Sequence, residues 1–238
     1  MSSIRVFPKD AKLDRRALIA GFHGIGATGF WSTKFLIQEL HATRVCYIDS
    51  EFAPAVSSTV NGEISTPYEI FGAGQLAFLK ADVPPLRDNE NRFFRELADW
   101  ITESGVEEVC LIGGLDESLR NDESMYRVVL TTKMKERATM SDEKVLEEGR
   151  VIVGPVAIIL NALEMRNAAA YALLSYSNTE RIDPRAAATA IQFIAKRYNL
   201  QVDTLPLIKG AEELEREMST MAEKEREREK STRSAIYS

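Results

Sequence analysis

The chain has 238 residues, of which 45% are hydrophobic and 28% are charged, and this composition excludes a disordered or fibrous protein. The formal net charge is -6 and no basic stripe runs through the body of the sequence, so we expect no nucleic-acid partner. No stretch reaches the ~18 consecutive apolar residues that cross a bilayer. Together with the mixed polar N-terminus, these features predict a cytoplasmic protein without a membrane partner.

Cysteine and histidine are scarce. Cys46 and Cys110 lie in apolar runs far apart in the sequence, which favours buried thiols in a reducing compartment. With only His23 and His41 beside them, we expect no metal site.

The first part of the chain predicts a strand, a turn and a helix, followed by a β-rich patch. The apolar run 16–22 ends in glycines, as a buried strand does, and 28–40 has helical spacing. A second buried strand follows at 44–48. Beyond it, the Asn61-Gly62 pair is a hairpin signal in a segment rich in Ser, Thr, Gly and Pro. Short antiparallel strands are predicted at 63–66, 68–71 and 76–80.

The second part alternates helices and strands after Pro84-Pro85. The helix at 89–103 has an inner stripe of Phe93, Phe94, Leu97, Trp100 and Ile101. Strands are predicted at 109–113, 126–130 and 168–175, with Gly113-Gly114 as a tight turn. One helix is predicted from Gly154 to near 166. A second helix is predicted from Pro184 to 198, with Asp183 as its N-cap.

This alternation predicts an α/β domain over residues 1–202, with a mostly parallel or mixed sheet and helices on both faces. A C-terminal helix is predicted over 203–230 and a flexible tail over 231–238. Residues 209–238 contain 7 Lys or Arg and 8 Glu, which is typical of a solvated, projecting helix. Apolar residues at steps of four and three form a seam for packing on the body or on a neighbouring subunit: Leu207, Ala211, Leu214, Met218 and Met221.

The most enzyme-like motif is a formal G-x-G-x-x-G made by Gly24, Gly26 and Gly29 between a strand and a helix. With Asp49 at the end of the next strand, it matches a dinucleotide fingerprint, in which backbone N–H groups hold a pyrophosphate and the carboxylate holds a ribose. The segment 52–80 lacks the crossover helix that such a fold needs. The favoured interpretation is therefore that these glycines, with Gly21, permit a tight turn and close packing, so we expect no cofactor.

Other polar groups also lack a catalytic pattern. Asp116, Glu117, Asp122 and Glu123 follow a predicted strand, where ligands bind in open α/β sheets, but a solvated acidic loop is the favoured interpretation. His23 has no nucleophile and orienting group in a recognisable pattern, so we expect a structural histidine and no catalytic residue.

Four segments carry a family resemblance: ALIAGFHGIG at 17–26, VGPVAIILN at 153–161, DPRAA at 183–187 and LQVDTLPL at 200–207. They resemble the proteasome assembly chaperone family, and most closely the archaeal homologues of the second eukaryotic chaperone subunit, over about residues 15–220. The resemblance implies a three-layer α/β/α fold similar to nucleoside phosphorylases without their catalytic apparatus. It also implies that the partner is the proteasome core.

The last three residues support that partner. Ile236, Tyr237 and Ser238 resemble the hydrophobic-tyrosine-any-residue ending with which proteasome activators and some assembly chaperones dock between α-ring subunits. Several tails on one homo-oligomer would gain avidity on the order of 10² to 10⁴ over a single tail. The leading hypothesis is a non-enzymatic assembly chaperone or activator-like factor. The alternative is a small-molecule enzyme of nucleoside-phosphorylase or dinucleotide type that uses Gly24 to Gly29.

Overall fold

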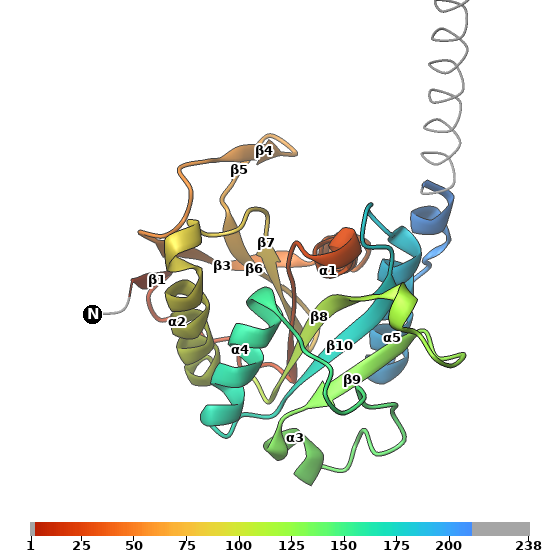
Figure 1. Cartoon of the computed structure of the whole chain (residues 1–238). Coiled ribbons are helices and arrows are strands. Elements are labelled where there is room, and N and C mark those ends of the chain that lie inside the picture. The colour runs from red at the N-terminus through yellow and green to blue at the C-terminus, as the bar shows by residue number, and fades with distance from the viewer. Residues whose placement is uncertain (1–2, 211–238) are drawn as a thin grey trace, which may run out of the picture. The chain divides into compact units, whose positions relative to one another are not determined.

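The computed structural model describes residues 3–210. They belong to two compact units, and the boundary along the chain is between Val202 and Asp203. The first unit holds an eight-stranded sheet with the order β1-β3-β6-β7-β2-β8-β10-β9 and a separate two-stranded sheet, β4-β5 (Figure 1). In the second unit, residues 205–210 are helical. The strands are β1 (Ile4–Phe7), β2 (Ala17–Gly21), β3 (Thr43–Ser50), β4 (Ser58–Val60), β5 (Glu63–Ser65), β6 (Tyr68–Ala73), β7 (Leu76–Ala81), β8 (Glu108–Asp116), β9 (Tyr126–Leu130) and β10 (Ala170–Ser177). The helices are α1 (Thr28–Glu39), α2 (Glu90–Glu103), α3 (Thr132–Glu136), α4 (Gly154–Met165) and α5 (Pro184–Tyr198), with short 3-10 turns η1 (Ile25–Ala27), η2 (Arg87–Asn89) and η3 (Glu117–Leu119).

The large sheet is mixed. Its four neighbouring strands β7, β2, β8 and β10 are parallel, whereas β6, β3 and β1 on one side and β9 on the other pair antiparallel. Every residue of β2 and β10 is buried. Burial on both faces agrees with the apolar sequence of β2 and of residues 170–174 in β10, whereas Ser175 and Ser177 of β10 are buried polar residues. The predicted mixed α/β class is confirmed, while the phosphorylase-like layering stays a prediction.

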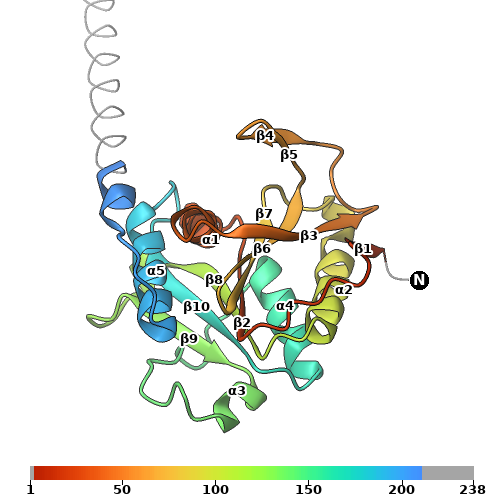
Figure 2. The ribbon, with the colours of Figure 1, turned by 180° about the vertical axis from the view of Figure 1, so that it is seen from behind.

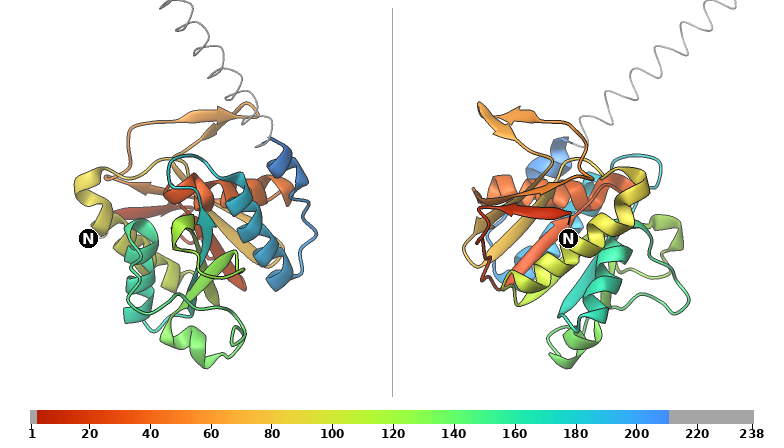
Figure 3. Two further views of the ribbon diagram at one scale, coloured as in Figure 1. Left: turned by 45° about the vertical axis from the view of Figure 1, so that its right-hand side comes forward. Right: turned by 90° about the vertical axis from the view of Figure 1, so that its left-hand side faces the viewer.

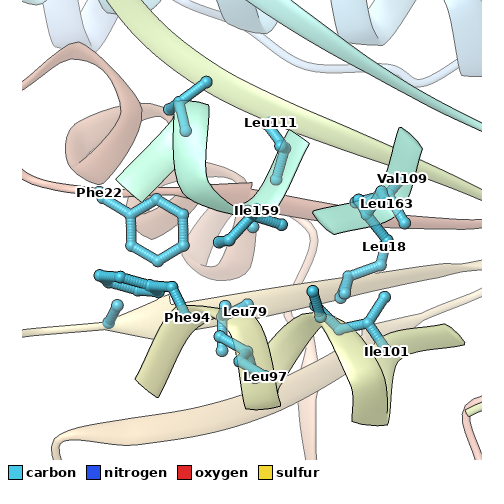
Figure 4. Packing of buried hydrophobic residues seen from close by; sticks show 14 of the residues in the cluster. Leu18, Phe22, Leu79, Phe94, Leu97, Ile101, Val109, Leu111, Ile159 and Leu163 are labelled. Carbon is cyan, nitrogen blue, oxygen red and sulfur yellow. The ribbon is translucent and has the colours of Figure 1, made fainter. Parts of the chain in front are cut away.

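One face of the sheet is covered by α2 and α4, which pack against each other (Figures 2 and 3). Leu18 and Leu111 from the sheet meet Phe94 and Leu97 of α2 and Ile159 of α4 in a continuous hydrophobic cluster (Figure 4). Four of the five residues predicted for the inner stripe of α2 are buried, and Trp100 is partly exposed.

The helices α1 and α5 pack against each other and against the sheet, and their contact depends on small side chains. Ser32 of α1 donates hydrogen bonds to Thr28 O at 2.8 Å and to Ala187 O of α5 at 3.3 Å. The buried residues of α1 are Thr28, Gly29, Ser32, Thr33 and Leu36, so only one of its large apolar side chains is fully buried. The aromatic residues that gave this segment its apolar pattern, Phe30, Trp31 and Phe35, are partly exposed instead.

Two predicted elements were wrong in detail. Gly113 and Gly114 are not a turn: they lie inside β8, where a Cβ on Gly114 would collide with the backbone of Ile25. The run at 44–48 is not a doubly buried strand, because β3 pairs antiparallel with both neighbours and half-buried residues alternate with buried ones along its second half. The helix α3, capped by the Thr131 hydroxyl, was not predicted.

The predicted start of one helix and one predicted hairpin turn are confirmed. The Asp183 carboxylate accepts hydrogen bonds from the N–H groups of Arg185 and Ala186 at the start of α5, both at 3.1 Å. Asn61-Gly62 forms the turn between β4 and β5, with both residues at positive φ.

Several predicted residues fall outside the part of the chain that the structure describes. These are Ala211, Leu214, Met218 and Met221 of the seam and the tail 231–238 with Ile236, Tyr237 and Ser238. Leu207 lies in the helical segment 205–210. Over residues 3–210, no helix has the length and apolar character to traverse a bilayer.

Candidate functional site

The glycine-rich turn joins β2 to α1 and has a packing role at most of its glycines. A Cβ on Gly21 would collide with the backbone of Gly29, and a Cβ on Gly29 would collide with Ile112 O and lie 2.8 Å from Phe22 N. Gly26 has φ +59°, and a Cβ there would collide with the Ser177 hydroxyl. Gly24, with φ -175° and open space around it, needs no glycine. Close approach of β2, α1 and β8 therefore explains Gly21 and Gly29.

Asp49 does not lie beside this turn. In a dinucleotide-binding fold the second strand pairs directly with the first. Here β3, which carries Asp49, is separated from β2 by β6 and β7, and Asp49 forms an ion pair with Arg5 of β1. The structure therefore does not bring together the four residues of the dinucleotide alternative.

His23 stacks on Phe30, with the ring centroids 4.1 Å apart. Burial lowers the pKa of His23, with a further lowering by Lys34 and an opposing effect of Asp82. The ring is therefore neutral at pH 7. His23 thus contributes an aromatic stack with Phe30 of α1, and its purely structural role stays a prediction.

The carboxylates after β8 form local hydrogen bonds and ion pairs. Asp116 accepts from Ser118 N at 2.9 Å, and Glu117 accepts from the Asn178 amide at 3.1 Å. Asp122 contacts Lys144 at 2.7 Å, and this bond together with one from Ser124 N lowers its pKa to about 2. Within residues 3–210 no group of three or more His, Cys, Asp or Glu side chains is arranged to hold a metal ion.

A groove of about 960 Å³ lies between α1 and the β4–β5 hairpin. We call residues 56–66, which include this hairpin, the arm. Phe30, Lys34 and Ile37 of α1 form one wall, and Val60 and Ile64 of the arm lie on the other. The floor is made by side chains of β3, β6 and β7. No motif in the sequence pointed to this groove.

A buried ionic network lies at the base of the arm. The carboxylate of Glu69 is only 1% exposed and accepts from Lys80 Nζ at 2.9 Å and Arg44 Nη1 at 3.5 Å. Lys80, itself 12% exposed, also donates to Ser65 Oγ at 2.7 Å and to Thr66 O at 2.9 Å. A buried charge is tolerated only where such partners replace its water. The network thus fixes the end of β5 to the large sheet.

This network had a signal in the sequence. Glu69 and Lys80 are single charges inside two apolar segments that a short turn joins, and the antiparallel register places them directly opposite each other. Opposite charges at facing positions of a predicted hairpin in the core therefore indicate a buried pair.

A second buried cluster lies at the amino ends of β8 and β10. Glu108 accepts from Arg197 Nη2 at 3.0 Å and from the Tyr198 hydroxyl at 2.7 Å, and the Tyr171 and Tyr198 hydroxyls are 3.1 Å apart. Burial raises the pKa of Tyr171 and Tyr198 well above the ordinary tyrosine value. Each phenol is therefore protonated at neutral pH and can donate a hydrogen bond inside the core.

Solved structures with similar folds are known. The Pyrococcus furiosus protein PbaA, an archaeal homolog of proteasome-assembly chaperone, is 23% identical with a TM-score of 0.78, covering 97% of this chain and 96% of PbaA. PbaB of the same organism, an archaeal proteasome activator, is 20% identical with a TM-score of 0.72, covering 93% of this chain and 100% of PbaB. A PAC2 family protein from Streptomyces avermitilis is 17% identical with a TM-score of 0.63, covering 87% of this chain and 96% of that protein. At these identities the similarity establishes the fold.

Comparison of the sequence with curated proteins gave no significant match. The sequence of residues 18–222, which is most of the chain, matches the PAC2 family. The family resemblance inferred from the sequence segments is thereby confirmed. The chain belongs to the PAC2 family.

Proposed function

We propose that this protein is a non-enzymatic proteasome assembly chaperone or activator-like factor that binds the proteasome α-ring through Ile236, Tyr237 and the carboxylate of Ser238. The observation that carries the proposal is the Ile-Tyr-Ser sequence on a chain of the PAC2 family. PbaA and PbaB, which share the fold, are a homolog of a proteasome-assembly chaperone and a proteasome activator. Their descriptions support the same class of partner here.

Each of the three residues has a physical role in this proposal. Ile236 contributes apolar area, Tyr237 adds a rigid ring with a hydroxyl, and the Ser238 carboxylate pairs with a pocket lysine. A single three-residue peptide buries little surface, and ordering it costs free energy. We therefore propose that a homo-oligomer presents several tails, which raises the apparent affinity on the order of 10² to 10⁴ over one tail.

The surroundings of the enzyme-like motif support the non-enzymatic part of the proposal. Gly26 and Gly29 have packing roles, Asp49 is paired with Arg5, and Asp116 and Asp122 are engaged in local hydrogen bonds. The alternative, a phosphorylase-type or dinucleotide-binding enzyme, therefore gains no support from the arrangement of these residues. A thermal-shift panel with nucleosides, phosphate, ATP and NAD tests it. A bound ligand at ~100 times its Kd adds ~2.7 kcal/mol, so a clear rise in Tm would contradict the proposal.

Binding of the full-length chain to immobilised proteasome α-rings tests the tail directly. Deletion of 236–238 should abolish binding, and Tyr237→Ala should weaken it at least tenfold, because the ring and hydroxyl are lost. Ser238→Ala is the matched control, since it retains a terminal carboxylate and should bind as the parent does. Adding one glycine after Ser238 displaces the carboxylate and should weaken binding. Equal binding of the deleted and full-length chains would overturn the proposal, provided both melt at the same temperature.

A further inference from the structure

The segment between α3 and α4 runs beside the outer edge of β9, which is the last strand of the large sheet (Figure 1). The N–H of Val128 in β9 donates to Lys144 O at 2.9 Å, and Val128 O accepts from Leu146 N at 3.0 Å. Residues 144–146 therefore occupy this edge in a short parallel bridge. An uncovered sheet edge is a template for pairing with another strand. We call residues 141–153 the strap.

Two neighbouring side chains of β9 hold the strap from both faces of the sheet. The Tyr126 hydroxyl, whose ring lies against Phe193 of α5, donates to Glu143 of the strap at 2.8 Å. Arg127 pairs with Glu147 of the strap at 2.8 Å. Successive side chains of a strand point to opposite faces, so these two contacts fasten the strap on either side of the edge.

Arg127 is the centre of the attachment. Its side chain is only 2% exposed, and besides Glu147 it contacts Asp122 at 3.2 Å. Asp122, which precedes β9, in turn contacts Lys144 of the strap at 2.7 Å. The four side chains form a closed ring of alternating charge, in which the strap supplies one cation and one anion.

This ring can open on the strap side without leaving a buried charge unpaired. When Glu147 moves away, Arg127 keeps Asp122, the Asn121 side-chain oxygen at 3.0 Å and Tyr126 O at 3.0 Å. Loss of a partner is most costly when it leaves a buried charge with no compensating group. Release of the strap therefore costs much less than removal of Arg127 from the core.

The strap has few other attachments. None of the residues from 141 to 153 is buried, and apart from the bridge at Val145 they form neither helix nor strand. The strap follows Met140, which is 4% exposed, and precedes Gly154, whose φ is +74°. It thus lies between a fixed point and a residue type that adopts many backbone conformations. Segments with so few buried contacts open at lower free energy than the strands they cover.

We propose that the strap opens and closes over the edge of β9 while the large sheet stays folded, with the Arg127–Glu147 pair as its latch. In the closed state, residues 144–146 take the pairing positions at Val128, so this edge is not offered to another strand. In the open state, the N–H and C=O of Val128 become accessible to an added strand. The proposal concerns described residues alone and does not depend on the C-terminal tail.

Hydrogen exchange of the full chain tests the opening. The amide protons of Val128 and Leu146 exchange when the strap is open, whereas those of β2 exchange only in larger unfolding events. In the parent protein, the protection factors of Val128 and Leu146 should therefore be roughly tenfold or more below those of β2. Equal protection in both places would overturn the proposal, since the strap would then open only with the whole domain.

A pair of neighbouring variants tests the latch. Glu147→Gln removes the charge that faces Arg127 and keeps the size of the side chain. It should raise exchange at Leu146 and trypsin cleavage after Lys144 by roughly tenfold or more, with no change in β2. Glu148→Gln is the matched control, because Glu148 is exposed and alters the charge near the same cleavage site. Equal effects of the two variants, or a similar increase in β2, would contradict the role of the latch.

A disulfide shifts the equilibrium in the opposite direction. Val128 and Val145 face each other in the bridge, and neighbouring strands lie about 4.8 Å apart, which is within the Cα separation that a disulfide spans. Oxidised Val128→Cys/Val145→Cys should therefore slow cleavage after Lys144 by roughly tenfold or more relative to its reduced form. The two native thiols are buried and do not compete. Absence of the cross-link, or equal cleavage of the oxidised and reduced forms, would refute the proposal.

Discussion

Gly29→Ala separates the packing role of the glycine-rich turn from a ligand-binding role. The added methyl carbon would collide with Ile112 O, lie 2.8 Å from Phe22 N and lie 3.0 Å from the Gly21 Cα. Ordinary carbon–oxygen contacts are ~3.3 Å or longer. All three neighbours are backbone atoms of β2, its end and β8, so no side-chain rotation can relieve the overlap.

The expected cost follows from that geometry. Overpacking a well-packed core costs about 1–3 kcal/mol, and an overlap with backbone on two sides places Gly29→Ala at or above ~3 kcal/mol. In a domain of 150–250 residues each kcal/mol lowers Tm by ~2–4 °C, so Tm should fall by roughly 6–12 °C. Gly24→Ala is the matched control, because its φ of -175° suits any residue and no atom lies within 4 Å of the added Cβ. It should change Tm by less than about 2 °C.

Calorimetry or circular dichroism of the full chain, with urea titration for the free energies of unfolding, measures both variants. Similar stability of Gly29→Ala and the parent would refute the packing argument. A large loss of stability in Gly24→Ala would show that the turn carries a constraint that these contacts do not contain.

Three other measurements test buried or charged groups. Lys80→Met should lower the free energy of unfolding by ~3 kcal/mol, because Glu69 stays buried with only Arg44 as a charged partner. The double variant Glu69→Leu/Lys80→Met should recover most of this loss in urea titrations, and no recovery would contradict the pairing. The pKa of Asp122 is lowered to about 2 in the folded chain from about 3.9 in the unfolded chain, so its carboxylate stabilises the fold above pH ~4 and this contribution disappears as pH falls through ~2. Asp122→Asn should therefore flatten the dependence of Tm on pH between pH 5 and 2. An unchanged slope would show that the Asp122–Lys144 contact does not contribute to stability. Burial raises the pKa of Cys46 to about 11 and that of Cys110 to about 12. Ellman's reagent at pH 8 should therefore label neither thiol in the folded chain and both thiols in urea. Rapid labelling without urea would contradict their burial.

Sequence reasoning succeeded where one local rule decides the structure. Uniformly apolar runs such as 17–21 and 170–174 are buried strands, and Asp183-Pro184 begins a helix because the carboxylate caps it and proline suits the first turn. Asn61-Gly62 similarly forms a hairpin because both residues accept positive φ.

Prediction from the sequence failed where the same residue type can have two structural roles. Gly113-Gly114 was assigned to a turn, yet both residues lie within β8, where Gly114 allows the close approach of Ile25. Glycine is suited both to tight turns and to close backbone packing, so its presence alone does not distinguish the two. On α1, the apolar spacing of Phe30 and Trp31 does not reveal that Ser32 and Thr33 face the core, since that depends on how closely α5 packs. The buried ionic network was missed for a related reason: the facing positions of Glu69 and Lys80 follow only once the register of β6 and β7 is known.

The position of β2 in the sheet order determines when the protein can fold during synthesis. Ala17 of β2 pairs with Leu76 of β7 and with Glu108 of β8, so the strand that leaves the ribosome near the start must await partners made much later. At ~5–20 residues per second, about 90 residues take on the order of 5 to 20 s. In the first part of that interval the apolar run 17–21 has neither neighbour, and until β8 is made it can pair only with β7. Such non-local pairing slows folding and exposes an aggregation-prone strand. We therefore expect that protection of the apolar run 17–21 in the nascent chain lowers its aggregation during synthesis.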